Sequence, residues 1–232
     1  MAIFLPLKDN NPLEIIPFQV VTVSLIVACV AVFLWQVSLS DAAGNSFIFA
    51  YGTIPAVLFD VKILAPELVR VPAETTLITS MFVHGSWWHL IGNMLYLWVF
   101  GDNVEDSMGH RRFVAFYLIC GIAAALTHAV TEPGSATPVV GASGAISSVM
   151  GAYLVLHPRV KVLALIFNRI PLRLPAYVLL VGWIGLQLFN AYGGGDGSTA
   201  WWSHIGGFLA GAALVVPLRH KTVPLFDRHR PG

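Results

Sequence analysis

The stretch VVGASGAISSVMGAYL, residues 139–154, carries small and polar side chains where a membrane-spanning helix would ordinarily carry leucine. It includes four consecutive small residues, Gly141 to Gly144, so the hydroxyl of Ser143 has no bulky neighbour in sequence. Small residues of this kind serve close helix packing in membranes, and an uncrowded hydroxyl also suits a nucleophile. The rest of the sequence distinguishes between these two interpretations.

The composition is that of a membrane protein. The chain has 232 residues, of which 56% are hydrophobic and 11% charged, and its mean hydropathy is +0.75. An ordinary soluble domain carries about 25% charged residues. A net charge of +1, with no basic patch among aromatics, argues against nucleic acid as a partner. Both cysteines, Cys29 and Cys120, lie in apolar runs, so we expect buried side chains and predict no disulfide, metal or cofactor.

Six apolar segments reach, or nearly reach, the length of about 20 residues that crosses a bilayer. They are residues 18–39, 87–101, 113–130, 139–156, 175–192 and 201–218. The sequence therefore predicts an all-α, polytopic membrane protein with six transmembrane helices in a single domain, residues 1–232. We expect a short cytoplasmic N-terminus (1–17), a long outside loop (about 41–86) and a cytoplasmic tail (about 219–232), with no additional soluble domain.

The distribution of Lys and Arg predicts the orientation. If the N-terminus is cytoplasmic, eleven of the thirteen basic residues fall on the inner side, and only Lys62 and Arg70 lie outside. Such asymmetry is typical of cytoplasmic loops. Both termini are then inside, and the second, fourth and sixth segments run from the outside inward. The compact six-helix layout favours a bacterial plasma membrane, with any site at the start of these three segments opening to the outer side.

Each of these three segments begins with strongly polar side chains. The second carries His89 and Asn93, which are four residues apart and so share one helix face, the fourth carries Ser143, and the sixth carries His204. Polar and ionisable groups are costly inside a membrane and mark functional sites. Because the three helices run in the same direction, all four side chains are expected at one depth, near the outer surface.

These groups match the needs of acyl transfer. A serine hydroxyl is a weak nucleophile until a base accepts its proton, and His204 can be that base for Ser143. Attack on a carbonyl creates an oxyanion, to which the Ser143 backbone N–H, the Asn93 amide and the His89 imidazole could donate. We therefore predict Ser143 and His204 as catalytic residues, and His89 and Asn93 as the oxyanion hole.

Four glycines are expected to support this site. Gly207 and Gly211 form a G-x-x-x-G contact motif, which can draw the sixth helix against the small face that begins at Gly144. That contact would bring His204 toward the fourth helix. Gly141 and Gly144 leave room for a substrate backbone to approach the hydroxyl between them.

The acids indicate a dyad instead of a triad. All twelve Asp and Glu residues lie in loops, at the termini or at helix ends, and Asp196, on the outer side, falls in a glycine-rich loop. The base must then be held by packing and by neutral groups. Other hydrolase classes fit poorly: no H-E-x-x-H motif is present, Asp102 has no partner acid within a membrane segment, and Ala145 interrupts a G-x-S-x-G motif.

Three motifs in this order, HLIGN, GASG and SHIGGFLAG, closely resemble those of the rhomboid intramembrane serine proteases. The stretch MFVHGSWWHLIGNMLYLWVFGDNVED is similar to the bacterial form of the family, and the resemblance covers roughly residues 15–220. It implies that Ser143 is the nucleophile and His204 the base, with His89 and Asn93 in the oxyanion hole.

The resemblance also implies substrates that are transmembrane proteins, cut near the membrane surface after local unwinding. Segment 175–192 and the loop that follows it would form the substrate entrance. The partners expected are therefore membrane-protein substrates and the lipid bilayer; no pattern specifies an oligomeric state.

Two features depart from the family pattern. Ser147 stands where many relatives carry an aromatic residue that stacks on the base, and we hypothesise that it orients His204 by a hydrogen bond instead. The stretch before residue 87 lacks the Trp-Arg pair that many relatives carry. The alternative function is that of a non-catalytic, rhomboid-like protein that binds client helices. A transporter is less favoured, because charged residues at mid-membrane and repeat symmetry are not evident.

Overall fold

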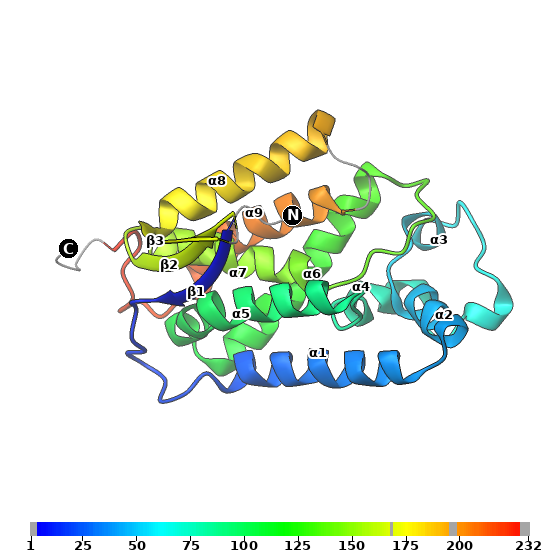
Figure 1. The fold of residues 1–232 in the computed structure, drawn as a ribbon, viewed down its shortest axis with the longest axis horizontal. Coiled ribbons are helices and arrows are strands. Elements are labelled where there is room, and N and C mark those ends of the chain that lie inside the picture. The colour runs from blue at the N-terminus through cyan, green and yellow to red at the C-terminus, as the bar shows by residue number, and fades with distance from the viewer. Residues whose placement is uncertain (1–3, 168, 195–198, 228–232) are drawn as a thin grey trace.

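The computed structural model describes residues 4–167, 169–194 and 199–227 and shows a bundle of long apolar helices (Figure 1). Within that part of the chain, each of the six predicted segments contains one helix, which confirms the predicted six-helix bundle. These helices are α1 (Val20–Ser38), α5 (Trp87–Met108), α6 (His110–Thr131), α7 (Ser143–Leu156), α8 (Ala176–Phe189) and α9 (Trp201–Leu218).

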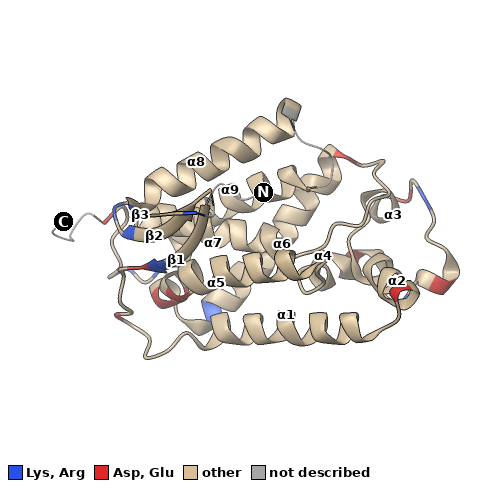
Figure 2. Cartoon of the chain, in the orientation of Figure 1, with Lys and Arg blue, Asp and Glu red and all other residues tan. Residues whose placement is uncertain are grey.

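The charges lie at the two ends of the bundle and leave the middle apolar (Figure 2). Among the described residues, four helices are long and apolar enough to cross a membrane: α1, α6, α8 with its continuation to Gly193, and α9. Helix α5 is as long as α6 but carries three acids, Asp102, Glu105 and Asp106, in its last turns. Helix α7 is apolar but shorter, with 14 residues.

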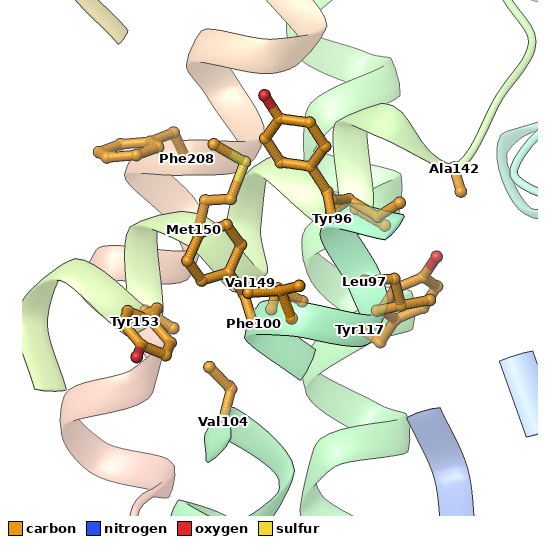
Figure 3. Packing of buried hydrophobic residues seen from close by; sticks show 14 of the residues in the cluster. Tyr96, Leu97, Phe100, Val104, Tyr117, Ala142, Val149, Met150, Tyr153 and Phe208 are labelled. Carbon is orange, nitrogen blue, oxygen red and sulfur yellow. The ribbon is translucent and has the colours of Figure 1, made fainter. Parts of the chain in front are cut away.

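Helix α7 occupies the centre of the bundle, and most of its residues are buried. Its Tyr153 meets Phe100 of α5 edge to face, with ring centroids 4.9 Å apart. Figure 3 shows Met150 of α7 pointing toward the same cluster as Phe208 of α9. Because its neighbours surround it, α7 can carry small and polar residues without exposing them to lipid.

Two acids in the last turns of α5, Glu105 and Asp106, hold the beginning of α1 and the segment before it. Glu105 accepts hydrogen bonds from the backbone N–H groups of Val21 (2.9 Å) and Thr22 (2.8 Å) and from the Thr22 hydroxyl (2.7 Å). Asp106 accepts from three consecutive N–H groups, those of residues 14, 15 and 16. The first N–H groups of a helix lack intrahelical partners and favour negative charge. Glu105 therefore caps α1 from a neighbouring helix, whereas Asp106 holds the segment that leads into α1.

A three-stranded antiparallel sheet covers one end of the bundle, an element that the all-helical prediction did not include. Strand β2 (Lys161–Ile166) pairs with both β1 (Phe4–Asp9) and β3 (Ile170–Pro175). Phe4 is buried, and its carbonyl accepts a hydrogen bond from the Tyr96 hydroxyl of α5. The N-terminal segment is thus tied to the α7–α8 connection and to α5.

The long segment 41–86 is built from short helices: α2 (Asp41–Tyr51), α3 (Pro55–Leu58), η1 (Pro66–Leu68), η2 (Ala73–Thr75) and α4 (Thr76–Thr79). Hydroxyl groups connect them. Thr53 donates to the Thr76 carbonyl (2.9 Å), and Thr79 donates to the Tyr51 carbonyl (2.8 Å). These bonds anchor the segment in the absence of the Trp-Arg pair found in many relatives.

The same segment holds the approach to α7. Thr53 and Val139 exchange two backbone hydrogen bonds, at 3.0 and 2.8 Å, and the Gly141 N–H donates to the Ser80 carbonyl at 2.9 Å. Segment 41–86 therefore holds residues 139–141, just before Ser143, in place.

Candidate active site

Ser143 is the first residue of α7, although the predicted apolar segment begins at residue 139. The chain turns at Gly141, whose φ of +114° is a conformation that residues with a Cβ rarely adopt. A helix of 14 residues is only about 21 Å long, whereas the hydrocarbon core of a bilayer is about 30 Å thick. Helix α7, which begins at Ser143, is therefore too short to cross the hydrocarbon core by itself.

Helices α7 and α9 are in backbone contact along a line of small residues. A Cβ at Gly207 would collide with the Gly144 carbonyl oxygen, and a Cβ at Gly211 would collide with the Ser148 carbonyl oxygen. From the other side, a Cβ at Gly151 would collide with the carbonyl of Phe208. This α7–α9 contact holds His204, in the first turn of α9, beside the start of α7.

The structure brings Ser143 and His204 into hydrogen-bond contact. The Ser143 Oγ lies 2.9 Å from His204 Nε2. The second ring nitrogen, Nδ1, lies 2.8 Å from the Gln187 Oε1 of α8. Both nitrogens of the imidazole thus contact neutral groups, and no hydrogen bond from His204 to an acid is found among the described residues. Asp196, the acid considered from the sequence, lies outside the described residues.

Gln187 was not identified from the sequence. It is buried, with 3% of its surface exposed, and it lies on the same face of α8 as Leu180 and Trp183, which are also buried. The signal that could have found it is the one that identified His89 and Asn93: a strongly polar residue in an apolar membrane segment.

The hypothesis that Ser147 orients His204 is wrong. The Ser147 hydroxyl donates instead to the Ser143 carbonyl at 2.6 Å, one turn back along α7. The aromatic neighbours of His204 come from other helices: the Trp183 ring lies 5.7 Å away between centroids, and the Trp201 ring 6.2 Å away. Helix α8 thus supplies both a hydrogen-bond partner and an aromatic neighbour for the imidazole.

His89 and Asn93 lie on α5 and face the turn before Ser143. Ser86 caps α5 by accepting a hydrogen bond from the His89 N–H at 3.2 Å. A Cβ placed on Gly141 would stand 2.6 Å from His89 Nε2 and 3.4 Å from Asn93 Nδ2, so both side chains point at this turn.

The amide of Asn93 is buried, and its Nδ2 has no partner among the described residues. A buried donor without an acceptor costs free energy. The first N–H groups of α7 likewise have no acceptor within their own helix. Donors from two helices therefore converge beside the Ser143 hydroxyl, where a negatively charged oxygen would satisfy them.

His84 stands behind His89 and is fully buried. Its ring meets that of His89 edge to face, with centroids 5.3 Å apart. Burial, together with the nearby His89 imidazole, lowers the pKa of His84 to about 4. His84 therefore supports His89 as a neutral ring and brings no charge to the site.

Comparison with known proteins adds a family match. A family model described as "Rhomboid domain" matches residues 72–221, a range that contains Ser143, His204, His89 and Asn93. The chain is 31% identical over 146 residues to "Rhomboid protein 1, mitochondrial" of Saccharomyces cerevisiae, an alignment that covers 61% of this chain and 41% of that protein.

Two further relatives show similar levels of identity. "Presenilin-associated rhomboid-like protein, mitochondrial" of Mus musculus is 30% identical over 162 residues, covering 64% of this chain and 40% of the relative. "RHOMBOID-like protein 5" of Arabidopsis thaliana is 34% identical over 91 residues, covering 39% of this chain and 29% of the relative. The alignments therefore span well under half of the length of these relatives.

Proposed function

The chain belongs to the rhomboid family, and from that premise we propose that it is an intramembrane serine endopeptidase that hydrolyses peptide bonds in or near transmembrane segments of membrane proteins. The observation that supports this most is the 2.9 Å contact between Ser143 Oγ and His204 Nε2. It lies at the start of α7, beside the donors of α5. The proposed catalytic residues are Ser143 and His204, and the proposed oxyanion hole consists of His89, Asn93 and the Ser143 N–H.

In the proposed first half-reaction, the Ser143 oxygen attacks the carbonyl carbon of the scissile bond while His204 Nε2 accepts the hydroxyl proton. The carbonyl oxygen becomes an oxyanion and accepts hydrogen bonds from the Asn93 amide, the His89 ring and the Ser143 N–H. When the C–N bond breaks, His204 returns the proton to the departing amine. The product is an ester between Ser143 and the N-terminal part of the substrate.

In the second half-reaction, a water molecule attacks this ester and gives a proton to His204. The same groups donate hydrogen bonds to the second oxyanion, and the proton then returns to the Ser143 oxygen as the acid product leaves. Each step uses groups of this chain and water alone. We therefore expect cleavage to continue undiminished in the presence of a chelator such as EDTA, measured on purified protein; loss of activity that added metal restores would contradict the mechanism.

The decisive test is cleavage of single-span membrane proteins by the purified chain in detergent, with Ser143→Ala and His204→Ala as variants. Ser24→Ala is the control, because Ser24 lies exposed on α1 and bonds only to the Val20 carbonyl there. We expect cleavage with the unmodified chain and the control, and none with either variant. Cleavage that survives Ser143→Ala would overturn the assignment of the nucleophile, and no cleavage across a broad panel would favour the client-binding alternative.

The chain is a membrane protein with several apolar helices. We propose that both termini are cytoplasmic and that the site opens outward. This orientation places eleven of the thirteen Lys and Arg residues on the cytoplasmic side. Figure 2 shows most of the described basic residues at the end of the bundle where the sheet lies. Two of the relatives above are mitochondrial by name; for this chain we propose a bacterial plasma membrane, on the basis of its compact six-helix layout.

Reporter fusions in a bacterial host test this orientation. A fluorescent protein that matures only in the cytoplasm should be bright at the C-terminus. Alkaline phosphatase, which is active only outside the cytoplasm, should be active when inserted in segment 41–86. The reverse pattern would overturn the proposed orientation.

A further inference from the structure

We infer that Gln187 of α8 is a positioning residue that fixes the tautomer of His204, so that the site is a chain of three neutral groups, Gln187, His204 and Ser143. This inference rests on the proposed function, because it concerns how the proposed base is made ready to accept a proton. It follows in three steps from the hydrogen bonds around the Gln187 side chain.

The first step fixes the direction of the Gln187 amide. Its Nε2 lies 3.2 Å from the Trp183 carbonyl oxygen. A carbonyl oxygen only accepts hydrogen bonds, so the group that faces it must be the NH₂, which donates. The Gln187 oxygen, Oε1, therefore faces His204 and is not interchangeable with the nitrogen.

The second step fixes the proton on His204. Gln187 Oε1 can only accept, and it lies 2.8 Å from His204 Nδ1, so Nδ1 must carry the hydrogen. In a neutral imidazole the other nitrogen is then bare. Nε2 is that nitrogen, and it lies 2.9 Å from the Ser143 oxygen. The Ser143 hydroxyl thus donates to Nε2, which is the arrangement that a general base requires.

The third step explains why a neutral amide suits this position. Gln187 and Trp183 are both at least nine-tenths buried, on the side of α8 that packs against α9. An Asp or Glu here would place a charge inside a membrane-spanning segment, where charged side chains are costly. An amide oxygen accepts the same hydrogen bond without that cost. Gln187 therefore orients the His204 imidazole, as the acid of a catalytic triad would, but it leaves the resting site uncharged.

The tautomer can be measured directly, without any substrate. Full-length protein labelled with ¹⁵N at the histidine rings is studied by NMR in detergent micelles, and a His204→Gln sample identifies the signals of His204. We expect His204 to be protonated at Nδ1 in the unmodified chain, and to populate the Nε2-protonated form in Gln187→Leu. An Nε2-protonated ring in the unmodified chain, or an unchanged tautomer in Gln187→Leu, would overturn the inference whether or not the chain cleaves anything.

A second experiment uses the pH dependence of cleavage. Gln187→Leu should lower kcat/KM at least about tenfold, with less loss than removal of the base itself, which is worth about 10²–10⁴. Gln187→Glu should restore much of that rate at high pH. It should also move the acidic limb of the profile upward by about 1–3 pH units, because a carboxylate stabilises the imidazolium.

The matched control is Asn190→Asp, which adds the same charge at the residue directly after α8. The Asn190 side chain bonds to the Leu186 carbonyl of α8 and not to His204. It should leave the acidic limb nearly in place. Equal shifts in Gln187→Glu and Asn190→Asp, or an unaltered rate in Gln187→Leu, would show that Gln187 is structural only. Cleavage that persists after Ser143→Ala would instead refute the proposed function and not this inference.

Discussion

The α7–α9 contact and helix α8 both position the His204 imidazole, but the α7–α9 contact is tightly packed and α8 is more open. Along the α7–α9 contact the backbones touch, and Gly144, Gly207 and Gly211 leave no room for a Cβ. On α8, a Cβ at Gly182 or Gly185 would meet nothing within 4 Å. Many apolar side chains of α8 also face outward from the bundle, among them Val181, Leu188 and Phe189.

The difference separates two properties of His204, the proposed base. The distance from His204 to Ser143 depends on the α7–α9 contact, which cannot loosen without losing the packing of two helices. The proton position on His204 depends on Gln187, which belongs to the more open α8. Distance and tautomer can therefore be disturbed independently. Gly211→Ala and Gly185→Ala compare the two regions, and Asn93→Ala and Gly141→Ala, which lie outside both, complete the comparison.

The largest effect is expected from Asn93→Ala, which leaves both the α7–α9 contact and α8 untouched. Removal of one oxyanion donor typically lowers kcat by about 10²–10³. Among the described residues the Asn93 Nδ2 has no hydrogen-bond partner, so its loss should cost little stability. Steady-state kinetics and SDS-induced unfolding measure the two effects. A large loss of stability with kcat unchanged would mean that Asn93 is a structural residue.

The next effect is expected from Gly211→Ala, which breaks the α7–α9 contact. The new Cβ would collide with the Ser148 carbonyl oxygen, and the helices would have to separate. Overpacking of this kind costs about 1–3 kcal/mol, and cleavage should fall with it because His204 moves away from Ser143. The free energy of unfolding in an SDS titration measures the first effect. A variant as stable and as active as the parent would show that the α7–α9 contact can accommodate a Cβ at position 211.

A similar but more local effect is expected from Gly141→Ala, at the turn before α7. A residue with a Cβ is strained at this φ of +114°, by roughly 1–2 kcal/mol. The Cβ would also press on the His89 ring. We expect kcat to fall more than stability does, because the disturbance lies between the oxyanion donors and the nucleophile. Equal losses of activity in Gly141→Ala and Gly211→Ala at equal stability would remove this distinction.

The smallest effect is expected from Gly185→Ala, the matched glycine substitution on α8. The added Cβ meets open space, and alanine is favoured over glycine within a helix by about 0.5–1 kcal/mol. Stability should be unchanged or slightly higher, with kcat near that of the parent. Destabilisation as large as that of Gly211→Ala, measured in the same SDS titration, would contradict the contrast between the two regions.

The sequence alone predicted the long apolar helices and the polar groups at their starts. Long apolar runs and strongly polar side chains at their ends are local patterns, so they can be read without knowing what packs against what. For the same reason Ser143, His204, His89 and Asn93 stood out, and the G-x-x-x-G spacing indicated which face of α9 would carry the contact.

Only the tertiary structure decided what completes the site. Gln187 and His204 come from different helices, and no local pattern states that an amide on α8 will meet a ring nitrogen on α9. The pairing of residues 4–9 with residues 161–166, and the capping of α1 by Glu105, are equally non-local. Hydrophobic periodicity reports the environment of a side chain, whereas its partner depends on how distant segments pack together.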